Sequence, residues 1–245
     1  MIEIDSVQLA KITLNYQILR SKRRKKSISI RINSQGIQVI VPQNADSADI
    51  KEIISHKSAW ITKRLKHTQQ LLATNPPPQN FIAGEFISYL GRQYPIIRTD
   101  TISILDLQDN NFLIPVNSDQ DKLALCDRDT IRQQLTNWYI QQAKKFIPTR
   151  VELYAQHFGL ATPKIFIRNQ KKRWGSCNSK GELRFNWRII IAPLDLLDYV
   201  VAHELCHLEH FDHSPAFWQR LHEIMPDCDR RRQELAQNSI LFDIH

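Results

Sequence analysis

The chain carries Val201-Ala202-His203-Glu204-Leu205-Cys206-His207, and a third histidine, His213, follows six residues later. Residues four apart lie on one face of an α-helix, so His203 and His207 can direct their imidazoles at one metal ion. Glu204 lies beside that face, where its carboxylate can take a proton from a metal-bound water. The spacing therefore predicts a catalytic zinc site with Glu204 as general base.

The third protein ligand of this site is expected to be His213. Ser214 and Pro215 read as the N-cap and first residue of a new helix, and a histidine just before such a break can fold back toward the metal. His210 would lie roughly 7 to 8 Å along the helix axis beyond the midpoint of His203 and His207, so one ion cannot easily bind all three. The alternatives that stay open lie downstream, at His222, Glu223 and Glu234.

The segments around the motif predict a helix beside a strand. Apolar residues repeat at helical spacing between Pro193 and Glu209, which gives that helix one buried stripe. Before it, polar and apolar residues alternate from Glu182 to Ile189 after a glycine turn at Gly181, which is typical of a half-buried strand. Such a strand either pairs with an extended peptide at its free edge or simply supports the core.

The remaining pattern predicts an α+β protein. Strands are expected at residues 12–19, 27–32, 37–41, 86–89, 94–98, 103–107, 112–115 and 165–168. Helices are expected at residues 45–72, 128–158, 215–225 and 229–241. Consecutive prolines after Asn75 predict a stiff connector. We divide the chain into a β-rich region with one helix, residues 1–125, and a catalytic domain, residues 126–245.

The formal net charge of +8 comes from the first part of the chain. Residues 1–75 hold thirteen Lys and Arg against five acids, and the remainder balances. A basic patch of this kind can attract phosphates, although a solvated hairpin turn is the simpler interpretation. The candidate nucleic-acid contacts are the successive residues Lys22, Arg23, Arg24, Lys25 and Lys26.

Two absences bound the cellular context. No run of eighteen apolar residues occurs, so no transmembrane helix and no membrane partner are expected. The start Met1-Ile2-Glu3-Ile4-Asp5 lacks the basic and apolar regions of a secretion signal, which favours a cytoplasmic protein.

Several of these segments together resemble a known family. They run from Arg173 to Pro193, from Asp198 to His207 and from His213 to Trp218, with further likeness near Arg20, Ala59 and Tyr89. The chain is similar to the YgjP-like metallopeptidases, minimal zincins related to the SprT-like metalloproteases. The resemblance implies a zincin-like catalytic domain, with the HExxH helix packed beside a small sheet. It also implies that His203, His207 and His213 bind zinc and that Glu204 is the catalytic base.

The function expected from the sequence is zinc-dependent hydrolysis of peptide bonds in a peptide or protein substrate, with one Zn²⁺ per chain. Candidate contacts to the substrate or the tetrahedral oxyanion are Arg173, Tyr199 and His210. Two alternatives stay open. One is a nucleic-acid-associated, SprT-like protease, and the other is a non-enzymatic binding module whose zinc is structural.

Overall fold

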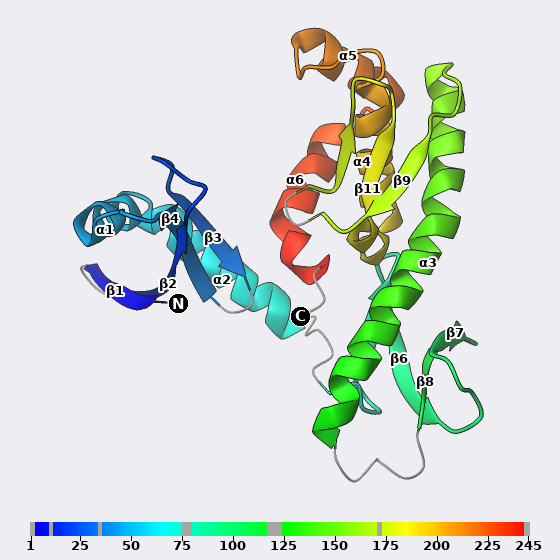
Figure 1. Ribbon diagram of the computed structural model, residues 1–245. Helices are drawn as coiled ribbons and strands as arrows, with labels where there is room; N and C mark the ends of the chain where they lie inside the picture. The colour runs from blue at the N-terminus through cyan, green and yellow to red at the C-terminus, as the bar shows by residue number, and fades with distance from the viewer. Residues whose placement is uncertain are drawn as a thin grey trace. The chain divides into compact units, whose positions relative to one another are not determined.

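The computed structural model describes residues 3–9, 12–33, 36–74, 80–116, 124–170 and 173–242. The chain forms two compact units, Met1–Pro76 and Pro77–His245 (Figure 1). This division differs from the predicted boundary after residue 125. The strands between residues 86 and 115 belong to the second unit because their apolar side chains share one core with the motif helix. The predicted proline connector, residues 75–78, lies outside the described residues.

The first unit is a four-stranded sheet with two helices. The sheet has the order β1-β2-β4-β3, with bounds Glu3–Leu9, Ile12–Ser21, Gly36–Pro42 and Ser29–Asn33. The predicted single helix is divided at Lys57 into α1 (Ser47–His56) and α2 (Ser58–Thr74). Lys57 leaves helical geometry with ψ near 8°, and both helices still bury isoleucines against the sheet. Strand β1 was missed, because its residues alternate without strong apolar character.

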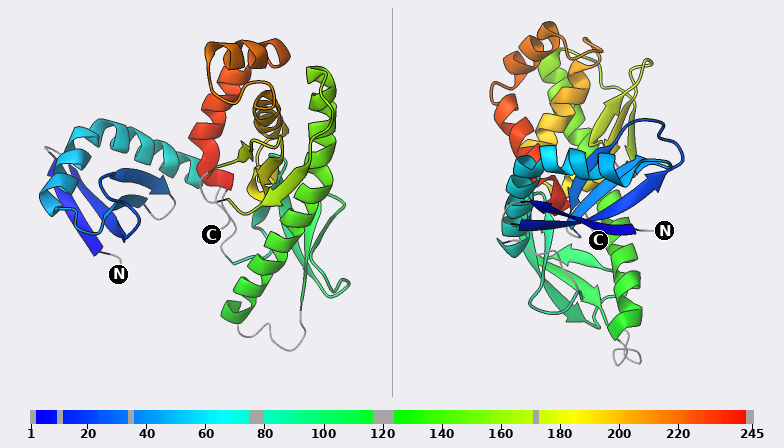
Figure 2. Two further views of the ribbon diagram at one scale, coloured as in Figure 1. Left: turned by 45° about the horizontal axis from the view of Figure 1, so that its top comes forward. Right: turned by 90° about the vertical axis from the view of Figure 1, so that its left-hand side faces the viewer.

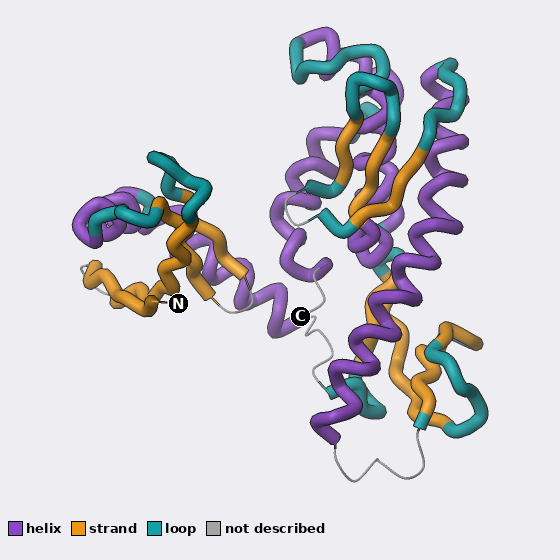
Figure 3. The backbone as a smooth tube through the Cα atoms, in the orientation of Figure 1, coloured by secondary structure: helices purple, strands orange, loops and turns teal. Residues whose placement is uncertain are grey.

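The described residues of the second unit form two small sheets (Figure 3). One has the order β5-β6-β8-β7, with bounds Phe86–Tyr89, Arg92–Thr99, Asn111–Pro115 and Asp106–Gln108. The other has the order β10-β11-β9, with bounds Gly175–Cys177, Leu183–Asn186 and Ile165–Arg168. Strand β10 is therefore an edge strand of its sheet.

Helix α3 (Ala124–Phe158) runs along the second unit beside both sheets (Figures 1 and 2). Its buried face includes Tyr139 and Ile147, in one core with both sheets and helix α4 (Leu194–Cys206). Near the far end, Arg150 donates two hydrogen bonds of 2.7 Å to Asp198 of α4. Because Asp198 is only 6% exposed, this ion pair ties the motif helix to α3.

The motif helix and its neighbours are shorter than predicted. The strand expected to reach Ile189 ends at Asn186, whose side chain accepts from the backbone N–H of Arg188 and starts a 3-10 helix, η1 (Trp187–Ile191). Helix α4 (Leu194–Cys206) is capped by His207, so His210 does not lie on its helical stripe. The chain then forms α5 (Pro215–Ile224), α6 (Cys228–Asn238) and a 3-10 helix, η2 (Ser239–Phe242).

Ser214 occupies the predicted N-cap position of α5, with Pro215 in the first turn. Its hydroxyl makes no capping bond; instead, its backbone N–H donates to the Asp212 carboxylate at 3.2 Å. No helix among the described residues is both long and apolar enough to cross a membrane.

Candidate metal centre

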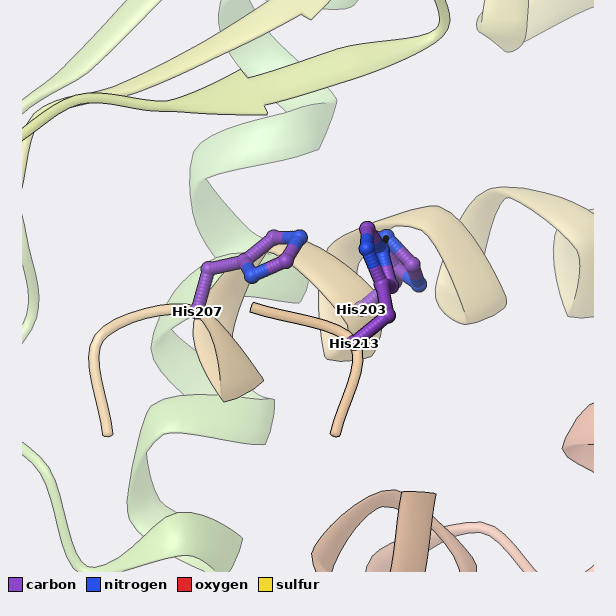
Figure 4. A group of neighbouring side chains, drawn as sticks. All are labelled: His203, His207 and His213. Carbon is purple, nitrogen blue, oxygen red and sulfur yellow. Dashed lines mark hydrogen bonds between the residues drawn. The ribbon is translucent and has the colours of Figure 1, made fainter. Parts of the chain in front are cut away.

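Three histidines converge where α4 ends. His203 lies in the last turn of α4, His207 caps that helix, and His213 lies in the loop before α5. One ring nitrogen from each lies within 4.8 Å of the others, and the Nε2 atoms of His203 and His213 are 3.1 Å apart (Figure 4). Three imidazole nitrogens at this separation can share one cation.

The protonation of His203 and His207 suits metal binding. Burial, reinforced by the nearby His207 and His213, lowers the pKa of His203 to about 3. Burial also lowers the pKa of His207. The Nδ1 atom of His207 lies 3.0 Å from the carbonyl oxygen of His210, so it donates a proton there and leaves Nε2 with a free lone pair. Neutral rings with free lone pairs are the form that coordinates a divalent ion, so the residues present fit the metal.

Glu204 is buried beside this cluster with a carboxylate oxygen, Oε2, that has no hydrogen-bond partner in the described structure. The side chain is 5% exposed, and burial raises its pKa to about 8 against the opposing charge of Arg173. Gly175 of strand β10 lies against the Glu204 side chain. A Cβ atom at Gly175 would lie 2.5 Å from Oε1, so only glycine leaves room for the carboxylate in this position.

Two aromatic residues of α5, Phe217 and Trp218, pack against the histidines and form an aromatic wall. The Phe217 ring centroid lies 5.0, 4.7 and 4.8 Å from those of His203, His207 and His213. Trp218 lies 5.8 Å from the ring of His213 on the same side. The thiol of Cys206 donates to the Phe217 carbonyl oxygen at 3.4 Å, which holds the end of α4 against α5. Phe217 is fully buried, so this wall excludes water from one side of the cluster.

A cavity of about 370 Å³ opens beside His203 and Glu204. Helix α4 contributes one wall, β10 and the residue before it a second, and the α6–η2 segment the third. The lining residues are Trp174, Gly175, Tyr199, Val200, His203, Glu204, Arg232, Leu235, Ala236 and Ser239.

The structure separates the three predicted contact residues. Tyr199 lines the cavity, its ring centroid lies 5.8 Å from that of His203, and burial raises the pKa of its hydroxyl to about 12. Arg173 is exposed and acts on Glu204 through its charge. His210 contributes its backbone carbonyl to His207. Neither His210 nor Arg173 lines the cavity.

The alternative third ligands lie elsewhere. Both nitrogens of His222 are engaged, with the Trp218 carbonyl oxygen at 2.6 Å and Asp229 at 2.9 Å. His222, Asp229 and Cys228 also form a group close enough for a metal, but these two hydrogen bonds raise the pKa of His222 and favour a charged ring. Glu223 pairs with Arg220 at 3.4 Å. Glu234 pairs with Arg230 at 2.8 Å.

Sequence reasoning missed three residues of the site. Gly175 and Phe217 stand in the segments that carry the family resemblance, but nothing in their spacing shows what they touch. Arg232 is one of three consecutive arginines, and only the packing of α6 shows that it faces the cavity.

The five candidate nucleic-acid contacts lie in the turn between β2 and β3. Lys22, Arg23, Lys25 and Lys26 are exposed. Arg24 differs, because its guanidinium donates to the carbonyl oxygens of Ser27 and Ile40 at 3.2 and 3.5 Å and so holds the turn together.

A buried carboxylate beside three converging imidazoles, on a helix packed against a small sheet, defines a metallopeptidase. The chain belongs to the YgjP-like metallopeptidases: the family model described as "YgjP-like, metallopeptidase domain" matches residues 26–238. It is therefore a hydrolase that requires a metal ion and acts on peptides.

Two solved structures are similar to part of this chain. One is the crystal structure of the metallopeptidase zymogen abylysin of Pyrococcus abyssi, 19% identical with a TM-score of 0.35, which matches 38% of this chain and 96% of its own. The other is the zymogen jannalysin of Methanocaldococcus jannaschii, 24% identical with a TM-score of 0.35, which matches 38% and 97%. No curated protein matches this sequence.

Proposed function

We propose that this metallopeptidase uses one Zn²⁺, held by His203, His207 and His213, and that Glu204 is its general base. The observation that carries the proposal is the convergence of three imidazole nitrogens within 4.8 Å beside a buried carboxylate. Three neutral imidazoles are a zinc donor set that leaves a fourth position for water or substrate.

Bound zinc lowers the pKa of a water molecule and polarises the carbonyl of the scissile bond. Glu204 performs the proton transfers. Its burial raises its pKa toward the neutral range, where a carboxylate can accept a proton from the attacking water and then release it to the leaving amine. Gly175 holds the carboxylate in place, because its backbone leaves that side chain little room to move.

The substrate backbone is proposed to lie along β10. This edge strand pairs with β11 on one side, and no other described strand covers its second side. An extended peptide there gains main-chain hydrogen bonds and passes beside Glu204. Tyr199 is the favoured donor to the tetrahedral oxyanion, because it lines the cavity and its raised pKa keeps its proton in place.

Metal analysis and peptidase assays on matched variants test this function. Wild-type protein is expected to hold about one zinc per chain, and Glu204→Gln to keep the metal while losing hydrolysis by about 10²-fold or more. His213→Ala is expected to lose both, whereas His210→Ala keeps both because only its backbone carbonyl is used. Full zinc binding in His213→Ala, or undiminished hydrolysis in Glu204→Gln, contradicts the assignment.

A second candidate function adds nucleic acid as a partner of the same peptidase. Four exposed cations, Lys22, Arg23, Lys25 and Lys26, gather in one turn of a unit that carries the whole net charge. Replacing all four with glutamine is expected to lower affinity for DNA and to flatten its salt dependence. If wild-type protein binds no DNA at moderate salt, or DNA leaves peptide hydrolysis unchanged, this candidate is rejected.

A further inference from the structure

The cavity beside His203 and Glu204 has a chemical character that the peptidase reaction does not require. It lies at the His203 end of the metal centre, and neither His207 nor His213 lines it. A substrate residue on one side of the scissile bond would therefore enter it, while the residue on the other side would not. Its lining can distinguish one peptide sequence from another.

Most of this lining is apolar. Trp174 forms one side and is backed by the ring of Phe242, 6.0 Å away. Val200 of α4 and Leu235 of α6, 4% and 6% exposed, line two other walls. The volume of about 370 Å³ falls within the range of ~300–1,000 Å³ that is usual for ligand sites and suits a large side chain. Such a lining favours a bulky apolar residue over a small or polar one.

Arg232 gives the same cavity a positive charge. The segment from α6 into η2 presents Arg232, Leu235, Ala236 and Ser239 at helical spacing, so Arg232 lies one turn before the apolar Leu235 on the same wall of the cavity. Its guanidinium lies over the Trp218 ring, 4.5 Å from the ring centroid, and forms an ion pair with Asp229 at 3.0 Å. These two contacts restrict where the guanidinium can lie.

The carboxylate of Asp229 does not satisfy Arg232. Asp229 also accepts from His222 at 2.9 Å, so its charge is shared between two partners. A guanidinium has five N–H donors, and the Arg232 side chain remains 51% exposed. Donors that stay free beside an apolar cavity match a carboxylate that arrives with an apolar side chain.

We propose that this cavity is the specificity site of the enzyme and binds a bulky apolar residue of the substrate, while Arg232 binds a carboxylate of the same peptide. The inference rests on the proposed peptidase function. Two sources can supply that carboxylate, an acidic residue beside the apolar one or the free C-terminus of the peptide. The first makes the enzyme an endopeptidase with an acidic preference, and the second makes it an enzyme that trims C-terminal ends.

Binding to zinc-loaded Glu204→Gln tests the proposal without turnover. Four fluorescent peptides suffice: a capped peptide with an internal Phe-Asp pair, the same peptide with Phe-Asn, and a peptide ending in Phe as the free acid or the amide. We expect the carboxylate forms to bind about tenfold tighter than their neutral partners, the effect of one charge-assisted pair. The carboxylate comes from the acidic side chain if the Phe-Asp peptide binds more tightly than the Phe-Asn peptide. It comes from the C-terminus if the free-acid peptide binds more tightly than the amide.

Variants on α6 identify the residue responsible. Adding Arg232→Gln is expected to abolish the tenfold preference and to leave the neutral peptides unchanged. Arg230→Gln is the matched control, because it removes the same charge from α6 at a residue that pairs with Asp195 and Asp227 outside the cavity. Ala236→Leu narrows the cavity and is expected to weaken the binding of phenylalanine-containing peptides about tenfold relative to alanine-containing peptides. Gln237→Leu, at the exposed neighbouring position, is expected to leave this ratio unchanged.

The outcomes separate this inference from the function on which it rests. Equal binding of acidic and neutral peptides, an unchanged preference in Arg232→Gln, or no binding of any of the four peptides overturns it. Wild-type hydrolysis that ignores these sequence differences rejects the specificity site and leaves the peptidase function intact. If Glu204→Gln binds the acidic peptides selectively through Arg232 but the wild type hydrolyses no peptide, the binding site is supported and the peptidase function is rejected.

Discussion

Replacing Gly175 with alanine is expected to disable the enzyme without removing its metal. The added Cβ would lie 2.5, 2.6 and 2.7 Å from the Oε1, Cγ and Cδ atoms of Glu204, whereas ordinary contacts begin near 3.4 Å. The whole carboxylate must therefore move by about 1 Å, a displacement that costs on the order of 10²-fold in rate. Crowding of a buried site adds a loss of ~1–3 kcal/mol in the free energy of unfolding.

The assay pairs peptide hydrolysis and metal content with urea unfolding of Gly175→Ala. Glu204→Ala removes the obstructing side chain, so Gly175→Ala in that background is expected to cost less than about 0.5 kcal/mol, which gives a coupling of ~1 kcal/mol or more. Ser179→Ala, an exposed change in the same hairpin, serves as the control. Activity of Gly175→Ala within twofold of the wild type, together with zero coupling, would refute the reasoning that β10 holds the carboxylate.

Three further predictions concern other parts of the second unit. Asp198→Asn leaves the partly buried Arg150 without its partner and is expected to lower the free energy of unfolding in urea by ~3 kcal/mol; an unchanged value shows that the pair does not join α3 to α4. Burial raises the pKa of Asp106, but the hydrogen bonds from Trp138, the backbone N–H of Leu107 and Gln108, with the charge of Lys145, together lower it below its usual value. The ionised Asp106 stabilises the fold fully above the pKa of the unfolded state, and this stabilisation is lost as pH falls through the pKa of the folded state. Between about pH 6 and pH 3, the free energy of unfolding should therefore fall more in the wild type than in Asp106→Asn. Equal decreases in the two proteins contradict this prediction. Phe217→Ala is expected to cost ~3–5 kcal/mol and to weaken metal binding, because this ring contacts all three histidines; metal affinity equal to that of the wild type shows that the wall is not needed.

The sequence predicts best what depends on residues close together in the chain. His203 and His207 face one point because they are four apart, and the helix start at Pro215 explains why His213 turns back. Most strands were predicted because their apolar residues alternate.

The sequence failed where tertiary contacts decide the outcome. Nothing before Asn186 shows that its side chain starts a 3-10 helix, so the strand was predicted three residues too long. The short strands between residues 86 and 115 look like a continuation of the N-terminal strands, yet their apolar faces pack on α3. Arg232 resembles its neighbours Arg230 and Arg231 in every respect except the direction in which α6 presents it.

The separation along the chain between the proposed ligands and the surroundings of the proposed base bears on the order of folding. The three proposed ligands lie within eleven residues, so they can meet as soon as the turn between α4 and α5 forms, at little cost in loop entropy. The surroundings of Glu204 come from Gly175, twenty-nine positions earlier, and assemble only when β10 docks on α4. With the proposed ligands and base, a nascent chain can bind its metal before the Glu204 carboxylate is held in position, and the peptidase becomes active only after β10 has docked.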